Sequence, residues 1–168
     1  MVSDFDRAFV LVVGVEGGLS LDPKDPGNWT GGATDKGSMR GTKWGISAKA
    51  YPDLDILNLS IEQAKAIYRR DYWDKCSCDQ LPTPLDVCVF DCAVNQGVGT
   101  AIRLLQDAVG TTVDGVIGPN TLARAAQARR ETCAMFMVDR MFKYMTTPNF
   151  DRYGRGWFKR VLMVFRDA

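Results

Sequence analysis

Residues 16–27 read EGGLSLDPKDPG, and this stretch marks the change from a predicted helix to irregular chain. The apolar residues ahead of it recur at helical spacing: Phe5, Phe9 and Val12. Ser3 is a favourable N-cap for this helix, and the Gly17-Gly18 pair is expected to end it. Glu16 takes the next position on the apolar face. From residue 17 to residue 45 the chain is rich in Gly, Pro, Asp and Thr without helical periodicity, which predicts short hairpins.

The remainder of the chain carries mostly helical signals. The Ser60 and Gln63 pair is a capping box that starts a helix, and Asp114-Gly115 is a tight turn. We expect a short helix from Ser47 to about Pro52 and longer ones over 60–73, 84–96, 99–109, 120–145 and 154–166. The sequence therefore predicts a mainly α (α+β) fold, with a small β-hairpin region between the first and second helices.

The composition restricts the chemistry. With 168 residues, 46% apolar and 24% charged, the chain is typical of one globular domain, 1–168. It has no histidine, which excludes Ser-His-Asp and Cys-His catalysis and zinc hydrolysis through histidine ligands. Catalysis must therefore use carboxylates, hydroxyls, thiols, lysine or arginine, and we expect no cofactor.

The charge is unevenly distributed. Residues 1–60 and 61–120 carry net charges of −2 and −3, whereas residues 121–168 carry +6. A basic C-terminal end favours binding to an anionic surface such as nucleic acid, a membrane or cell-wall polymer. The last predicted helix supplies much of this charge, in Arg155, Lys159 and Arg160. A solvated helix face rich in arginine is the alternative. No basic, aromatic-interleaved motif for nucleic acid is present.

The cysteines are five in number: Cys76, Cys78, Cys88, Cys92 and Cys133. No secretory signal is recognised, because the apolar run 9–15 is short, and no run approaches the ~20 apolar residues of a membrane span. We therefore expect free thiols in a reducing cytoplasm. A zinc site is the alternative, but Cys88 and Cys92 lie in an apolar helical run, which favours small buried residues and no metal.

Glu16 is the strongest catalytic candidate. Glu62 lies in the first turn of a predicted helix and Glu131 beside two arginines, so both have structural explanations. An apolar face and a helix C-terminus would each raise the pKa of Glu16 above its usual value of about 4.3, as a general acid requires. The alternative is a glutamate that caps the Gly-rich loop.

A general acid facing a second polar group is the equipment for glycoside hydrolysis. The candidates for the second group are Asp22, Asp25 and Asp35. Asp25 is the most constrained of them, because Pro26 and Gly27 fix its turn. An Asx-turn residue is the alternative for Asp25.

An ordered series of motifs resembles the N-acetylmuramidases of glycoside hydrolase family 108, common as phage endolysins. The series covers nearly the whole chain: EGGLSLDPKDPG (16–27), TKWGIS (42–47), YW (72–73), LP (81–82), FDCAVNQG (90–97), LLQ (104–106), DGVIGP (114–119) and GW (156–157). The resemblance implies a lysozyme-like helical fold that cuts the β-1,4 bond between N-acetylmuramic acid and N-acetylglucosamine. It also implies a catalytic segment over 1–81 and a helical peptidoglycan-binding region over 82–168, packed as one domain.

The resemblance assigns site residues. Glu16 corresponds to the catalytic acid, Asp25 to the D-P-G aspartate and Thr42 to a threonine that acts with the attacking water. The sugar contacts that we expect are Tyr72, Trp73, Asn95 and Gln96, with core packing as the alternative for Trp73. One departure from the family is the longer hairpin over residues 28–41, whose Thr30 and Thr34 compete with Thr42.

The implied biology is that of an endolysin. The enzyme would act as a monomer on bacterial peptidoglycan, without membrane insertion or nucleic acid. It would stay in the host cytoplasm until a holin-type partner releases it to the cell wall. Two other functions remain open: a lytic transglycosylase, and a non-catalytic wall-binding or virion protein.

Overall fold

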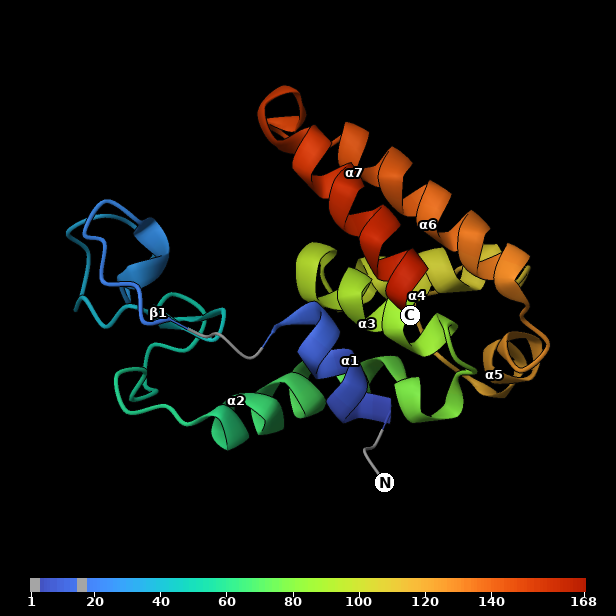
Figure 1. The fold of residues 1–168 in the computed structure, drawn as a ribbon, viewed down its shortest axis with the longest axis horizontal. Coiled ribbons are helices and arrows are strands. Elements are labelled where there is room, and N and C mark those ends of the chain that lie inside the picture. Colours follow the sequence, from blue (N-terminus) through green and yellow to red (C-terminus); the bar gives the residue numbers. More distant parts are fainter. Residues whose placement is uncertain (1–3, 15–17) are drawn as a thin grey trace. The chain divides into compact units, whose positions relative to one another are not determined.

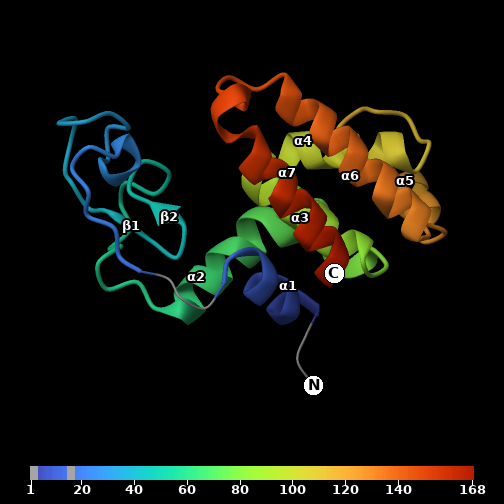
Figure 2. The ribbon, with the colours of Figure 1, turned by 45° about the horizontal axis from the view of Figure 1, so that its top comes forward.

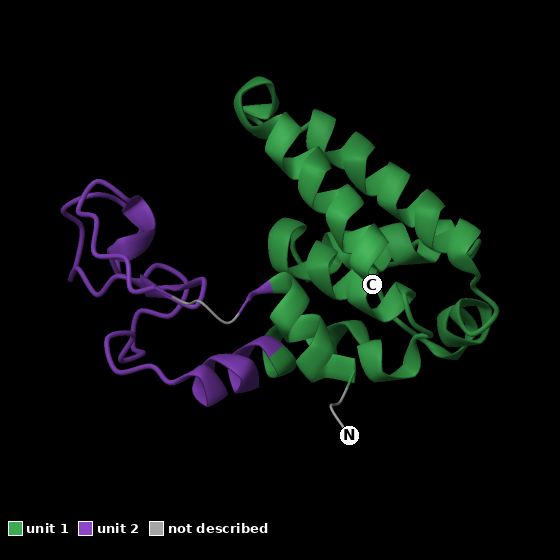
Figure 3. Ribbon diagram, in the orientation of Figure 1, with its two compact units in different colours: residues 1–12, 69–168 green, residues 13–68 purple. Residues whose placement is uncertain are grey.

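A computed structural model gives the fold and describes residues 4–14 and 18–168. The chain divides into two compact units, unit 1 (residues 1–12 and 69–168) and unit 2 (residues 13–68), which Figure 3 colours separately. None of the helices among the described residues is long and apolar enough to cross a membrane. The mainly α prediction with a small hairpin is confirmed.

Unit 1 is helical. Its α-helices are α1 (Asp4–Val12), α3 (Leu85–Gln96), α4 (Val98–Ala108), α5 (Pro119–Ala125), α6 (Arg130–Met145) and α7 (Phe150–Asp167). A π-turn, Arg69–Trp73, and two one-turn helices, Asp74–Cys76 and Cys78–Gln80, lead into α3. Helices α6 and α7 lie side by side in both views (Figures 1 and 2).

Helix α3 forms the core of unit 1, because every residue from Leu85 to Ala93 is buried. Nine consecutive residues cover every side of a helix, so neighbours must surround it, and α1, α4, α6 and α7 all contact it. The predicted apolar stripe of α1 is confirmed as buried: Phe5, Phe9 and Val12. Phe5 meets Trp73 and Phe90 edge to face, with ring centroids 5.5 and 5.9 Å apart.

Unit 2 holds one regular helix, α2 (Ile61–Tyr68), and little other regular structure. Strands β1 (Thr42–Lys43) and β2 (Ile46–Ser47) pair antiparallel, and a one-turn helix covers Pro26–Asn28. Isolated bridges join Ser20 to Thr42 and Trp29 to Met39. The prediction of short hairpins in this segment is thus confirmed.

Three of the helix predictions are wrong. Helix α1 ends at Val12 rather than at Gly17-Gly18, because Gly14 already has a left-handed backbone with φ of 83°. The expected helix after Ser47 is a set of turns. The expected helix over 120–145 is two helices, since a turn at 126–129 intervenes and Thr132 Oγ1 accepts a hydrogen bond from the Arg129 amide to start α6.

Candidate functional site

Asp25 lies at an exposed turn in unit 2. Its backbone is extended, and its Oδ1 accepts a hydrogen bond from the Gly27 amide at 2.8 Å, which caps the one-turn helix Pro26–Asn28. The Asx turn, which was the alternative interpretation of Asp25, is therefore present. Oδ2 makes no hydrogen bond to any described residue, so one carboxylate oxygen is left for solvent or a ligand.

Asn28 is buried and connects the turn of Asp25 to Thr42. Its amide N–H donates to the Asp25 carbonyl at 3.1 Å, and its side-chain Oδ1 accepts from Thr42 Oγ1 at 2.7 Å. Its Nδ2 donates to the Asp22 carbonyl at 3.0 Å and to Ser20 Oγ at 3.3 Å. Through its backbone and side chain, Asn28 thus joins residues 20–25 of the loop to Thr42. The sequence analysis did not single out Asn28, although asparagine in a Gly- and Pro-rich loop is suited to bonding with backbone groups.

Thr42 is fixed more firmly than the other two threonines. It is half-buried in β1, and its amide and carbonyl form two hydrogen bonds with Ser20, of 3.0 and 2.8 Å. Thr30 Oγ1 accepts from the Ser38 amide at 2.9 Å within the longer hairpin, and Thr34 lies exposed in a turn of that hairpin. Of the three, Thr42 is the one bonded to Asn28.

The β1–β2 turn explains the motif that contains Thr42. Trp44 and Gly45 have φ values of 54° and 74°, which is the two-residue turn with both central residues left-handed. A Cβ on Gly45 would lie 2.5 Å from the Tyr68 hydroxyl, which donates to the Trp44 carbonyl at 3.0 Å. Only glycine allows this close approach of Tyr68. The Trp44-Gly45 turn of the TKWGIS motif therefore keeps β1 in register with β2.

Glu16 falls outside the described residues. The helix on which its expected pKa shift depended ends four positions earlier, at Val12. Its assignment therefore remains a prediction that depends on the sequence and the family.

The four expected sugar contacts lie in unit 1 and differ in their freedom to bind. Trp73 is completely buried and donates from Nε1 to Asp79 Oδ1 at 2.8 Å, which is the core-packing alternative. A buried ring has no face to offer a sugar. Tyr72 is half-buried in the π-turn.

Asn95 and Gln96 line a cavity of about 330 Å³ together with Lys143, Tyr144, Thr147 and Trp157. The Tyr144 and Trp157 rings stack there with centroids 4.9 Å apart. Gln96 is used internally, because its Oε1 accepts from Arg140 Nε at 2.9 Å and its Nε2 donates to the Arg140 carbonyl at 3.3 Å. Asn95 is exposed and donates to the Asp91 carbonyl at 2.8 Å, which leaves its own oxygen without a bond to the described chain.

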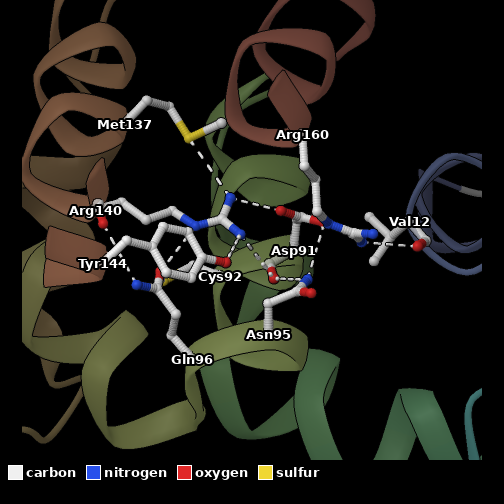
Figure 4. A network of polar contacts seen from close by, with 9 residues as sticks. All are labelled: Val12, Asp91, Cys92, Asn95, Gln96, Met137, Arg140, Tyr144 and Arg160. Carbon is white, nitrogen blue, oxygen red and sulfur yellow. Dashed lines mark hydrogen bonds and ion pairs between the residues drawn. The ribbon is translucent and has the colours of Figure 1, made fainter. Parts of the chain in front are cut away.

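A buried charge cluster supports this cavity (Figure 4). Asp91 and Arg140 are fully buried, and Asp91 Oδ2 lies 2.5 Å from Arg140 Nη1, an ion pair whose angle is not that of a hydrogen bond. Desolvation lowers the pKa of Arg140, but the Asp91 carboxylate, Cys92 and Tyr144 together outweigh it, so that pKa is raised overall.

Arg160 completes the cluster. It donates from Nε to Asp91 Oδ1 at 2.8 Å and from Nη2 to the Val12 carbonyl at 2.8 Å, at the C-terminus of α1. From the sequence, Arg160 is expected among the surface charges of the last helix. The structure corrects this, because Arg160 joins α7 to α1 and α3, and it shares the Asp91 carboxylate with Arg140.

Comparison with known proteins identifies the family. Residues 9–97, more than half of the chain, match the model of the family described as Glycosyl hydrolase 108. The chain belongs to this family. It is therefore a glycoside hydrolase, and all seven expected site residues fall within the matched segment. A search among curated proteins found no match.

A solved structure supports the same family fold over a longer stretch. SagA from Brucella abortus is 30% identical, with a TM-score of 0.78 over 96% of this chain and 91% of that one. The likeness therefore extends into residues 98–168, which the family model does not reach.

The cysteines of this glycosyl hydrolase 108 chain belong to its core. All five are free and buried, as predicted. Burial raises the pKa of Cys92 to about 12, and it raises the pKa of Cys133 as well. Residues 4–14 and 18–168 contain no group of three cysteines and carboxylates placed to hold a metal ion.

Proposed function

We propose that this chain hydrolyses the β-1,4 bond between N-acetylmuramic acid and N-acetylglucosamine in bacterial peptidoglycan, with Glu16 as the general acid. The observation that carries the proposal is the bonding of both the Asp25 turn and Thr42 to buried Asn28, inside the segment that matches a glycoside hydrolase family. A glycosidase needs an acid on one side of the bond and polar groups that hold water or stabilise the cation on the other.

The residues have separate roles in this mechanism. Glu16 donates its proton to the oxygen between the two sugars as that bond breaks. Asp25 Oδ2 and the lone pairs of Thr42 Oγ1 orient the attacking water. The Thr42 hydroxyl donates its hydrogen bond to Asn28 Oδ1, so Oγ1 can act toward the water only as an acceptor. Asn95 and Tyr72 contact the sugars. The proposed mechanism uses side chains of this chain alone and involves no cofactor.

The test is digestion of purified peptidoglycan followed by mass spectrometry of the products. Hydrolysis yields products with a reducing end, whereas a lytic transglycosylase yields an anhydro product lighter by one water. Glu16→Gln is expected to lower turnover about 10²–10⁴-fold, the usual contribution of one general acid. Glu131→Gln, an exposed glutamate on α6, is the matched control and should keep full activity.

Two outcomes would favour the other functions. Anhydro products would identify a transglycosylase. Wall binding without any released product, the same for wild type and Glu16→Gln, would identify a non-catalytic wall or virion protein.

We further propose the biology of an endolysin. The 1–81 segment would cut and the 82–168 region would bind peptidoglycan, as parts of one lysozyme-like monomer. The enzyme would wait in the host cytoplasm for a holin-type membrane permeabiliser. Expression in bacteria with and without such a permeabiliser tests this, because lysis should require both proteins.

A further inference from the structure

A second polar cavity of about 650 Å³ lies in unit 1, beyond the segment that the family model matches. The loop 110–118 and α5 form its walls. Its polar lining consists of hydroxyls, amides and two opposite charges: Thr111, Thr112, Asp114, Asn120, Thr121, Arg124 and Gln127. The apolar part of the lining comes mainly from Val116, Pro119 and Ala123.

A buried amide holds the loop wall in place. Gln106 on α4 is 1% exposed, and its Nε2 donates to Asp114 Oδ1 at 2.7 Å and to the Val116 carbonyl at 3.0 Å. Its Oε1 accepts from the Gly115 amide at 2.8 Å. Because one buried side chain satisfies three groups of the loop, the wall is shaped before any ligand arrives.

The two charges of the cavity are available. Arg124 is exposed, and its guanidinium forms no hydrogen bond or ion pair with any described residue. Asp114 is also exposed, and the hydrogen bonds from Gln106 and the Val116 amide lower its pKa, so it stays ionised. Its Oδ2 is unbonded to the described chain.

A site with an unpaired guanidinium and a carboxylate that has one unbonded oxygen is suited to a ligand that carries both charges. The glycan strand of peptidoglycan is neutral between its peptides, whereas the peptide stem has free carboxylates and, at its diamino acid, a free ammonium group. A guanidinium is well matched to a carboxylate, which it can bind through two parallel hydrogen bonds.

We propose that this cavity binds the peptide stem of peptidoglycan, with Arg124 holding a carboxylate and Asp114 an ammonium group. The inference rests on the proposed function for its substrate, but it concerns a site separate from Glu16, Asp25 and Thr42. Such a site would let the enzyme bind the peptide stems of the wall independently of glycan hydrolysis.

The experiment is an NMR titration of the full chain carrying Glu16→Gln, so that no probe is cleaved. One probe is the tripeptide L-alanyl-γ-D-glutamyl-meso-diaminopimelic acid, and the other is chitotetraose, a glycan without peptide. The tripeptide is expected to shift the amide signals of Thr111, Gly115 and Asn120. Adding Arg124→Ala should weaken its binding about tenfold or more, the effect of losing a hydrogen-bonded charge.

Arg7→Ala is the matched control, because it removes another exposed arginine of unit 1, on α1, and should leave tripeptide binding unchanged. Three results would overturn the proposal: no binding of the tripeptide, unchanged binding by Arg124→Ala, or the same signals shifted by chitotetraose instead. Each is distinct from failure of the proposed catalysis, which is measured on wild-type enzyme by released sugar.

Discussion

Residues 18–60 of unit 2 bury only four apolar side chains, whereas α3 in unit 1 buries nine consecutive residues. The buried apolar residues of the first segment are Ile46, Ala48, Ile56 and Leu59. The α3 stretch runs from Leu85 to Ala93. Unit 1 therefore gains its stability from apolar burial, at roughly 25 cal/mol per Å².

The loop of unit 2 depends instead on hydrogen bonds. Asn28 alone bonds to Ser20, Asp22 and Thr42 through its side chain. Hydrogen bonds are directional, so they suit a segment that must place a few polar groups, while apolar packing suits a scaffold. This difference between the units leads to four predictions, each directed at one unit.

The largest effect is expected for Asp91→Asn in unit 1. The change leaves Arg140 buried without its counter-charge, and breaking a buried pair in this way costs about 3–5 kcal/mol. Urea unfolding measures the loss. Asp167→Asn, which removes an exposed pair with Arg166 on α7, is the control and should keep the unfolding midpoint. Equal midpoints for the two variants would show that the buried cluster adds nothing to unit 1.

Asn28→Ala should affect unit 2 selectively. It removes three side-chain hydrogen bonds and leaves the Thr42 hydroxyl without its acceptor, at a cost of about 1–3 kcal/mol. Hydrogen exchange is expected to accelerate at the Ser20 and Thr42 amides and to stay unchanged in α3. Equal acceleration in α3 would contradict the view that the two units depend on different forces.

The exposed basic face of α7 is tested by the double variant Arg155→Glu and Lys159→Glu. Both residues are exposed, so the free energy of unfolding should change by less than about 0.5 kcal/mol. Binding to purified cell walls should weaken and lose its dependence on salt concentration. Arg160→Glu is the contrasting variant, since it places a carboxylate against Asp91 and should unfold unit 1. Unchanged wall binding by the double variant would leave this charge without a targeting role.

The smallest effect concerns the thiols, all of which lie in unit 1. A pKa raised by burial means less thiolate at a given pH, and with the pKa of Cys92 at about 12 almost none exists at pH 8. Native protein should therefore react slowly with a disulfide reagent at pH 8, and unfolded protein should release five equivalents. Asn28→Ala should keep the slow rate; fast reaction in that variant would mean that the core of unit 1 had opened too.

The sequence predicted much of this fold from local patterns. Helices α3 and α4 lie within two residues of the expected ranges, and the Ser60–Gln63 capping box is present, with Ser60 N donating to Gln63 Oε1 at 2.9 Å. These features depend on residues a few positions apart, so periodicity and capping rules suffice. The ends of helices were harder to predict, because distant residues contact them. The Val12 carbonyl at the end of α1, for example, accepts a hydrogen bond from Arg160, 148 residues later.

The site was only partly accessible from the sequence. The pattern of turn residues singled out Asp25 and the family resemblance proposed Thr42, but Asn28, which bonds to both, became evident only when the loop was folded. The absence of histidine and the order of the motifs determined the class of chemistry and the family. The tertiary structure alone decided which polar groups are internal, such as Arg160, Gln96 and Trp73, and which are free, such as Arg124 and Asn95. The physical reason is that burial and pairing depend on residues distant in the chain, which no local pattern specifies.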